Sequence, residues 1–286
     1  MDLIRDPAAM QQWAFDVRAR GETIAFVPTM GYLHDGHLSL MRIGRARADR
    51  LVASVFVNPL QFGEGEDLEV YPRDEEGDLA KCEAEGCDAV FFPQPDTMYP
   101  PGFQTRLVTG ALTTVLCGAS RPGHFDGVVT VVLKLFNLVQ PHVAVFGSKD
   151  YQQLQVIRRM VRDLAVPVEI IGGAIVREPD GLALSSRNAY LTDEQRVQAL
   201  ALSQSLALAE ARYAEGERDP AVLRALVQDH IAAQPLGDID YIELVDAEEL
   251  VPVYGLLTRP AVLALAVRFG RTRLIDNRVL GGTSPS

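Results

Sequence analysis

Up to about residue 176 the chain alternates between two hydrophobic patterns. Short runs rich in β-branched and aromatic residues are typical of strands buried on both faces of a sheet. They lie at 23–27, 51–57, 89–92, 143–146 and 168–171. Before and between them, hydrophobic residues recur at helical spacing at 8–20, 38–47, 74–87, 126–139 and 150–164. Strands that alternate with helices predict a mainly parallel sheet, so we expect an α/β, Rossmann-like domain.

The pattern changes near Arg177, after which two Ala- and Leu-rich segments precede three strand-like runs. The predicted helices are 199–214 and 221–233, and the predicted strands are 238–245, 261–267 and 272–276. This order of elements indicates a smaller α+β unit. We therefore expect two domains, a nucleotide-binding one at 1–176 and a C-terminal one at 177–286 that closes over the active site. The tail from Gly281 is predicted to be disordered.

Composition narrows the class of protein without choosing a function. The 286 residues are 48% hydrophobic and 23% charged, and the net charge of −11 argues against a nucleic-acid surface. No run approaches the roughly 20 apolar residues of a membrane span, and the first residues lack the form of a signal peptide. We expect a cytoplasmic protein. Three cysteines, Cys82, Cys87 and Cys117, complete neither a disulfide framework nor a zinc pattern.

The strongest candidate for chemistry is 28–37, which joins the first long strand to a helix. It carries neither a GxGxxG fingerprint nor a P-loop. It does place His34 and His37 at a helix N-terminus, where free N–H groups and the helix dipole favour an anion. Imidazole N–H groups can donate to phosphate oxygens. The stretch therefore predicts a phosphate-handling site.

Two further strand ends reach the same edge of the predicted sheet. Asn58 and Gln61 follow the second long strand and offer uncharged amides to a small polar substrate, although a loop cap is nearly as good an explanation. At 147–150, Lys149 is a candidate phosphate contact, and Asp150 is equally well explained as a helix N-cap. Gln152 or Gln153 could face the ligand.

Three loops add candidates of less specific pattern. The segment 184–187 combines hydroxyl groups with Arg187 and could close on a triphosphate, or it could be a capped turn. Arg121 could reach a substrate anion or be solvated. The acidic stretch that ends at Asp78 could hold Mg²⁺ with the phosphates, although a solvated loop explains it better.

Taken together, these motifs resemble those of the pantothenate synthetases, or pantoate–β-alanine ligases. The likeness runs from Ile24 to Asn277 and rests on segments 28–37, 54–62, 71–73, 121–125, 146–153, 184–188 and 270–277. The His-x-Gly-His element alone is common to a whole nucleotidyltransferase superfamily, and the combination in this order is far more specific. The chain departs from the residues usual in this family at Tyr32, Ser148 and Gly77. The departure at Gly77 leaves the identity of the metal ligands open.

The resemblance implies an ATP-dependent ligation of pantoate and β-alanine through a pantoyl adenylate, releasing pyrophosphate and AMP. It implies catalytic roles for His37 as proton donor, for His34, and, with the charge argument, for Lys149 and Arg187. It implies that Gln61 and Gln153 bind the pantoate and β-alanine side, to which we add Asn58 and Arg121. The implied ATP contacts are Met30, Gly31, Tyr32, Leu33, His34, Asp35, Gly36, His37, Gly147, Ser148, Lys149, Asp150, Val176, Leu184, Ser185, Ser186 and Arg187. Members of the family are dimers that need Mg²⁺, for which Asp78 is the candidate ligand.

Two alternatives remain open from the sequence. Another nucleotidyltransferase with this histidine motif, acting on a nicotinamide or pantetheine phosphate, would need more basic residues near 58–61, where this chain has none. A nucleotide-binding protein without catalysis would bind ATP and not turn it over. The joint presence of both histidines, Lys149 and Arg187 disfavours it.

Overall fold

The predicted strands of the first part all form and lie in one parallel sheet. In the computed structural model, which describes residues 1–282, they are β2 (Ile24–Thr29), β3 (Arg50–Val55), β4 (Ala89–Phe91), β5 (Val143–Gly147) and β6 (Glu169–Gly173). A further strand, β1 (Asp2–Ile4), pairs with β4 at the edge and was not predicted. The order is β1-β4-β3-β2-β5-β6, and all pairs are parallel. The Rossmann-like prediction is confirmed.

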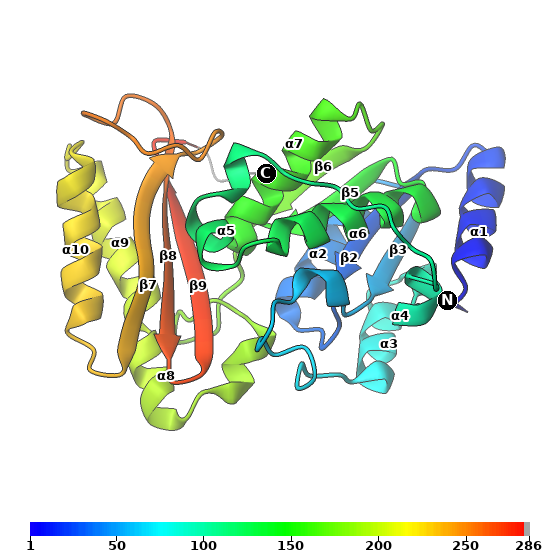
Figure 1. Ribbon diagram of the computed structural model, residues 1–286, viewed down its shortest axis with the longest axis horizontal. Helices are drawn as coiled ribbons and strands as arrows, with labels where there is room; N and C mark the ends of the chain where they lie inside the picture. The colour runs from blue at the N-terminus through cyan, green and yellow to red at the C-terminus, as the bar shows by residue number, and fades with distance from the viewer. Residues whose placement is uncertain (283–286) are drawn as a thin grey trace.

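Helices cover both faces of this sheet (Figure 1). They are α1 (Pro7–Ala19), α2 (Asp35–Arg45), α3 (Glu75–Ala84), α6 (His124–Val139) and α7 (Tyr151–Asp163), with short α4 (Pro95–Met98) and α5 (Leu116–Ser120). α4 lies in the proline-rich loop, where Pro95 occupies a position of the first turn that needs no N–H donor. None of the helices in residues 1–282 is both long and apolar enough to cross a bilayer.

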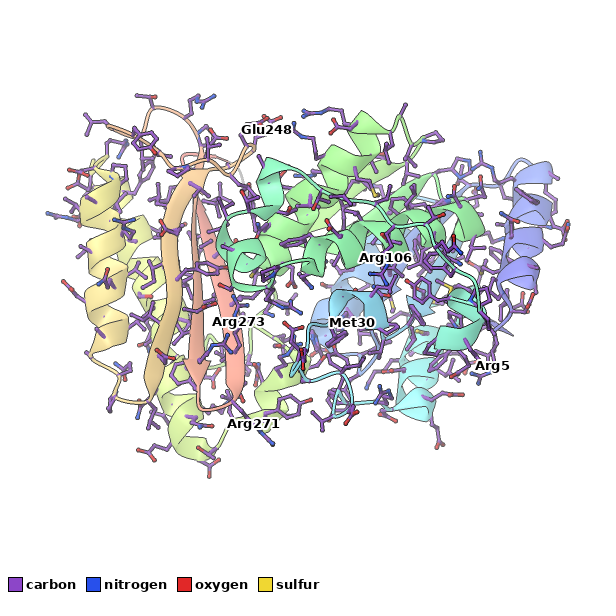
Figure 2. All side chains as sticks on the ribbon, in the orientation of Figure 1. Arg5, Met30, Arg106, Glu248, Arg271 and Arg273 are labelled. Atoms are coloured by element: carbon purple, nitrogen blue, oxygen red, sulfur yellow. The ribbon has the colours of Figure 1, made fainter. Side chains whose placement is uncertain are left out.

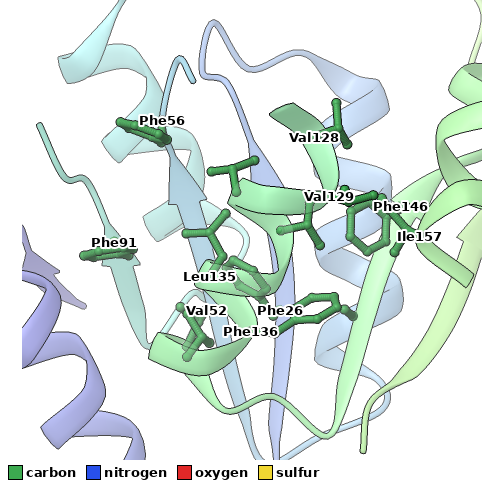
Figure 3. Packing of buried hydrophobic residues seen from close by; sticks show 14 of the residues in the cluster. Phe26, Val52, Phe56, Phe91, Val128, Val129, Leu135, Phe136, Phe146 and Ile157 are labelled. Carbon is green, nitrogen blue, oxygen red and sulfur yellow. The ribbon is translucent and has the colours of Figure 1, made fainter. Parts of the chain in front are cut away.

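Each strand sends alternate side chains to two separate cores, as the two-residue period of a strand requires. On β2, Ile24 and Phe26 pack with α1 and α6, and Phe26 meets Phe136 edge to face at 6.4 Å (Figure 3). Ala25 and Val27 pack on the opposite face, against α2 and α3. A sheet buried on both faces explains why its strands read as continuous hydrophobic runs in the sequence.

The C-terminal part forms a three-stranded antiparallel sheet with helices on its outer face (Figure 1). Its elements are α8 (Asp193–Ala199), α9 (Ala201–Ala214), α10 (Pro220–Ala232), β7 (Gly237–Asp246), β8 (Ala261–Phe269) and β9 (Thr272–Leu280). Leu206, Leu223 and Leu265 belong to the core between the helices and the sheet. The predicted strand at 272–276 is longer than expected, because it pairs with β8 along its whole length.

The inner face of the small sheet packs against the first part. Val262 and Ala264 of β8 meet Leu116 and Tyr151. Hydrogen bonds fasten β9 to the turn after β5, since Asn277 Nδ2 donates to the carbonyls of Ser148 and Lys149 at 3.0 and 2.9 Å.

An ion pair also ties β9 to the segment where the two parts join. Arg177 donates to Asp276 at 2.6 and 2.9 Å, and that carboxylate is buried. The boundary at 176/177 stays a prediction, and residues 283–286 of the predicted disordered tail lie outside the described residues.

Candidate active site

The sheet places a site between β2 and β5. From β2 the chain builds outward through β3 and β4, and then crosses to start β5 on the other side of β2. Ligands of open α/β sheets bind at such a reversal, outside the carboxyl ends of the strands. The turns that follow β2 and β5 meet at this point, and both line a cleft of about 280 Å³, called here the central cleft.

A buried carboxylate shapes the turn after β2. Asp78, which is 1% exposed, accepts the backbone N–H groups of Tyr32 and Leu33 at 2.8 and 2.7 Å. Gly31 has φ of 85°, and a Cβ there would lie 2.8 Å from both Asp78 Oδ2 and Val55 Cγ1. Tyr32 also has a positive φ, of 52°. A glycine at 31 and the carboxylate beneath the turn are therefore what give the loop its path.

The backbone sets the tautomer of both histidines. His34 is the N-cap of α2, and its Nδ1 accepts the N–H of Gly36 at 3.2 Å. The Nδ1 of His37 accepts the N–H of His34 at 3.3 Å. An Nδ1 that accepts carries no proton, so the proton of each neutral ring is on Nε2. Each ring thus keeps one N–H donor for a ligand in the central cleft, which both rings line.

Both rings are neutral near pH 7. Burial, together with the Lys149 ammonium, lowers the pKa of His34 to about 4, and burial, the neighbouring His34 and Lys149 lower the pKa of His37 to about 3. The ring centres are 4.1 Å apart, so two imidazolium charges would repel each other strongly. Before a ligand binds, both histidines are therefore neutral and present Nε2–H donors to the cleft.

These pKa values predict how acid affects stability. The unfolded chain has histidines of ordinary pKa, about 6.5, and so binds more protons than the native state below that pH. The stabilisation is fully present above pH 6.5 and is lost as pH falls from there through the folded pKa values of about 4 and 3. We expect the two rings to account for about 2 kcal/mol of the free energy of unfolding that is lost between pH 7 and pH 4. The value is set this low because both rings are partly exposed and solvent screens their charges.

Urea unfolding of the wild type and of the His34→Gln/His37→Gln variant at several pH values checks this. The variant should lose less free energy of unfolding on acidification. An equal loss in both proteins would contradict it.

The turn after β5 brings an ammonium group to the opposite side of the cleft. Lys149 lines the cleft, and no hydrogen bond or ion pair of its ammonium is found within residues 1–282. Asn277 holds its main chain, as described above. Asp150, also at the cleft, is the N-cap position of α7, but its side chain makes no cap hydrogen bond. Asp150 therefore stands at the N-cap position of α7, but its side chain does not cap the helix.

Asn58 acts on the cleft through Gln61. Asn58 is 1% exposed, and its Nδ2 donates to Gln61 Oε1 at 3.1 Å and to the carbonyl of Gly127 at 3.2 Å. Its Oδ1 accepts the hydroxyl of Tyr99 at 2.7 Å. Gln61 Nε2 donates one hydrogen to Met30 Sδ at 3.2 Å. Since Asn58 engages the oxygen, the second hydrogen on Nε2 is the donor that Gln61 keeps for a ligand.

The two glutamines at the start of α7 have different surroundings. Gln152 is buried and donates to the carbonyls of Leu112 and Val115 at 2.8 and 2.7 Å, which holds the loop before α5. Both glutamines line the cleft, but the amide nitrogen of Gln152 is already used by these two carbonyls, whereas Gln153 is half-buried and has no such bonds in the part of the chain that the structure describes. The choice that the sequence left open therefore favours Gln153 as the ligand contact.

Both candidate arginines are already paired. Arg121 donates from Nε and Nη2 to the two oxygens of Glu66, at 2.6 Å each. Arg187 donates in the same two-point manner to Asp67, at 2.9 Å each. His124, whose pKa is lowered to about 4 by burial, links Arg121 Nη1 to the carbonyl of Gln61 at 3.0 and 2.8 Å.

Most of the predicted site residues meet in the central cleft. Those that line it are Met30, His34, Gly36, His37, Asn58, Gln61, Arg121, Gly147, Lys149, Asp150, Gln153, Val176, Leu184, Ser185, Ser186 and Arg187. Gly31, Tyr32, Leu33, Asp35, Ser148 and Asp78 do not line it; Tyr32 and Asp35 are exposed, and the other four are buried. The roles assigned to these residues stay predictions.

Sequence reasoning missed several lining residues, among them Tyr71 and Arg273. Figure 2 labels Met30 after β2 and Arg273 on β9, which come to the cleft from different sheets. Arg273 pairs with Asp240 of β7 at 2.7 Å. A signal for the contribution of β9 was present in the sequence, because Asp276 and Asn277 are polar residues at the end of a predicted strand. In the structure both are buried, at 3% and 5% exposure.

No group of three or more His, Cys, Asp or Glu side chains able to hold a metal ion is present in the described part of the chain. The two oxygens of Asp78 each accept a backbone N–H, and burial raises the pKa of its carboxyl in spite of these donors. The cleft itself offers Asp150 as a carboxylate without an ion pair within residues 1–282. A Mg²⁺ ion would therefore need phosphate oxygens for most of its ligands.

Comparison with known proteins places the whole described chain in one family. A sequence profile described as pantoate–β-alanine ligase matches residues 2–279. A pantothenate synthetase from Geobacter sulfurreducens is 57% identical over 281 residues, which cover 98% of this chain and 99% of that protein.

Solved structures agree. A pantothenate synthetase from Thermus thermophilus superposes with a TM-score of 0.92 at 47% identity, covering 97% of this chain and 99% of that one. A pantoate–β-alanine ligase from Francisella tularensis, complexed with β,γ-ATP and β-alanine, has a TM-score of 0.79 at 31% identity and full coverage of both chains.

Proposed function

The chain belongs to the pantoate–β-alanine ligase family, and we propose that its central cleft joins pantoate to β-alanine at the expense of ATP. A carboxylate oxygen of pantoate attacks the α-phosphorus of ATP, and the bond to the β-phosphate breaks. Pyrophosphate leaves, and pantoyl adenylate remains. The amine of β-alanine then attacks the acyl carbon, the bond to AMP breaks, and the nitrogen loses a proton to give pantothenate.

One observation carries this assignment. The two neutral Nε2–H donors of His34 and His37 line the same cleft as the Lys149 ammonium and the uncharged amides of Gln61 and Gln153. A carboxylate that attacks a phosphate must overcome repulsion between like charges. Fixed donors in a partly dry site stabilise the charge that develops at the α-phosphate and on the departing pyrophosphate.

The half of the site for the acid carries little fixed charge. Gln61, held through its oxygen by Asn58, offers Nε2 to the pantoate carboxylate or hydroxyl and, after adenylation, to β-alanine. Gln153 on α7 faces the same space. Neutral amides orient an anion without a counter-charge that must be given up once the carboxylate has become the mixed anhydride of the adenylate.

The triphosphate half is formed by the two strand-end turns and the segment 184–187. Met30, Gly36, Gly147 and Val176 are assigned to ATP with the histidines, and Ser185, Ser186 and Arg187 approach from the second part of the chain. These residues exclude water from the adenylate, which water would otherwise hydrolyse.

Mg²⁺ fits this site as a companion of ATP. Phosphate oxygens would supply most of its ligands, and Asp150 is the carboxylate of the cleft that could add one; Asp78 remains the second candidate. When bound, the ion would neutralise phosphate charge.

The decisive experiment is exchange of labelled pyrophosphate into ATP. We expect exchange that requires pantoate and proceeds without β-alanine, since only the first step is reversed. Acids such as acetate and lactate, and nicotinamide or pantetheine phosphates, serve as controls. Exchange without pantoate, or exchange that needs one of the control substrates, would refute the assignment.

The resemblance also carries the expectation of a cytoplasmic homodimer. Light scattering on the purified chain tests the dimer. A mass of 31.3 kDa for the particle would contradict it.

A further inference from the structure

Two consecutive acids of one loop pair with Arg121 and Arg187, the two arginines of the cleft that the sequence assigns to substrate anions. Glu66 and Asp67 lie between the Asn58–Gln61 segment and α3. Glu66 takes Arg121, which lies just before α6, and Asp67 takes Arg187, which lies in the second part of the chain. The pairs join residues 55 and 120 positions apart. One dipeptide therefore engages both Arg121 and Arg187, while Lys149 and Arg273 are the other cationic side chains that line the cleft.

Both ion pairs are partly buried and two-pointed. The side chains of Arg121 and Glu66 are 17% and 25% exposed, and those of Arg187 and Asp67 are 29% and 25% exposed. The Arg187 guanidinium also lies over the Tyr71 ring, 5.6 Å from its centre. Such pairs are stronger than single contacts on an open surface.

The acids use the donors that a substrate anion would use. Each carboxylate takes Nε and Nη2 of its arginine, one edge of the planar guanidinium. That edge matches the spacing of two oxygens of a phosphate or carboxylate. The other nitrogen of Arg121, Nη1, already contacts His124. An incoming anion that binds the Nε–Nη2 edge of either arginine must therefore displace a carboxylate of the chain itself.

We propose that Asp67 and Glu66 are internal counter-ions that the substrate anions displace, Asp67 by a phosphate of ATP and Glu66 by the pantoate carboxylate. The proposal rests on the function proposed above. The two acids then determine specificity, because a ligand gains either arginine only if it presents two anionic oxygens. They also raise the KM for each anion, since the free arginine is populated only in part without ligand.

Removing the charge of Asp67 should tighten ATP binding. We expect Asp67→Asn to lower the dissociation constant of ATP, measured by calorimetry without pantoate, about five-fold, which corresponds to about 1 kcal/mol. The KM of ATP in pyrophosphate exchange should fall alike, with the KM of pantoate unchanged. Glu66→Gln should lower the KM of pantoate and leave that of ATP unchanged.

A matched control separates pairing from net charge. Glu64 is an exposed acid of the same loop with no ion pair in the described part of the chain, so Glu64→Gln removes one charge and no pair. It should change the ATP dissociation constant by less than about two-fold, the remainder being long-range repulsion.

A second background tests the exchange itself. In Arg187→Gln, the further change Asp67→Asn should have no effect on ATP affinity, because the partner is gone. An ATP affinity that is unchanged or weaker in Asp67→Asn, or a gain that persists in Arg187→Gln, would overturn the proposal. The calorimetric measurement needs no turnover, so it stands apart from a failure of pantoate-dependent exchange, which would count against the proposed function.

Discussion

Replacing His37 with Ala should slow adenylate formation about a thousand-fold while leaving ATP affinity within about three-fold of the wild type. The ring presents one neutral Nε2–H donor to the cleft, because its Nδ1 accepts the N–H of His34. A donor aimed at charge that develops only in the transition state typically contributes two to three orders of magnitude to the rate. Single-turnover formation of pantoyl adenylate, together with calorimetry of ATP, measures the two effects separately.

The variant His37→Gln asks whether a neutral donor is enough. A glutamine Nε2–H can occupy a place close to that of the ring nitrogen, so we expect it to recover at least ten-fold of the lost rate. His230→Ala, a change on α10 outside the central cleft, should leave the rate unchanged. An equal loss of rate and of affinity in His37→Ala would make the residue a binding group alone.

The sequence predicts the parallel sheet well because burial on both faces leaves a clear trace. Phe26 and Val27 point to opposite cores, and both are apolar. The hydrophobic pattern does not reveal β1, because its three residues pair only with β4 and are mostly exposed. Such a strand exists because a neighbour supplies its hydrogen bonds, and a single-chain pattern carries no sign of that neighbour.

The site is predictable for a related reason. The carboxyl ends of parallel strands meet at one edge, so the turns at 28–37, 58–61 and 147–150 had to come together. The side chains that contact those turns from other parts of the chain could not be deduced from the sequence. Glu66, Asp67 and Asp78 belong to one acidic stretch and look alike in the sequence. In the structure, Asp67 holds an arginine 120 residues away, and Asp78 supports a turn 45 residues away.

Asp78 is where this difference has its largest consequence. If Asp78 were a metal ligand, its loss would affect only the binding of ATP with Mg²⁺. As a support for the turn, its loss affects the stability of the fold. Its carboxylate replaces water for two backbone N–H groups that are covered by the turn, and leaving such donors unsatisfied costs about 1–3 kcal/mol each. The positive φ of Tyr32 adds strain that these hydrogen bonds hold in place.

We therefore expect Asp78→Ala to lower the free energy of unfolding by about 3 kcal/mol, with or without Mg²⁺, and to abolish exchange by releasing the turn that carries His34 and His37. Asp78→Asn keeps one acceptor and places an amide near the second N–H, so its loss should be about half as large. Asp74→Ala, which removes the exposed N-cap of α3, should cost about 1 kcal/mol and leave the turn in place. Urea unfolding and exchange at rising Mg²⁺ concentration separate the two roles. A variant with wild-type stability whose activity returns at high Mg²⁺ would make Asp78 a metal ligand instead.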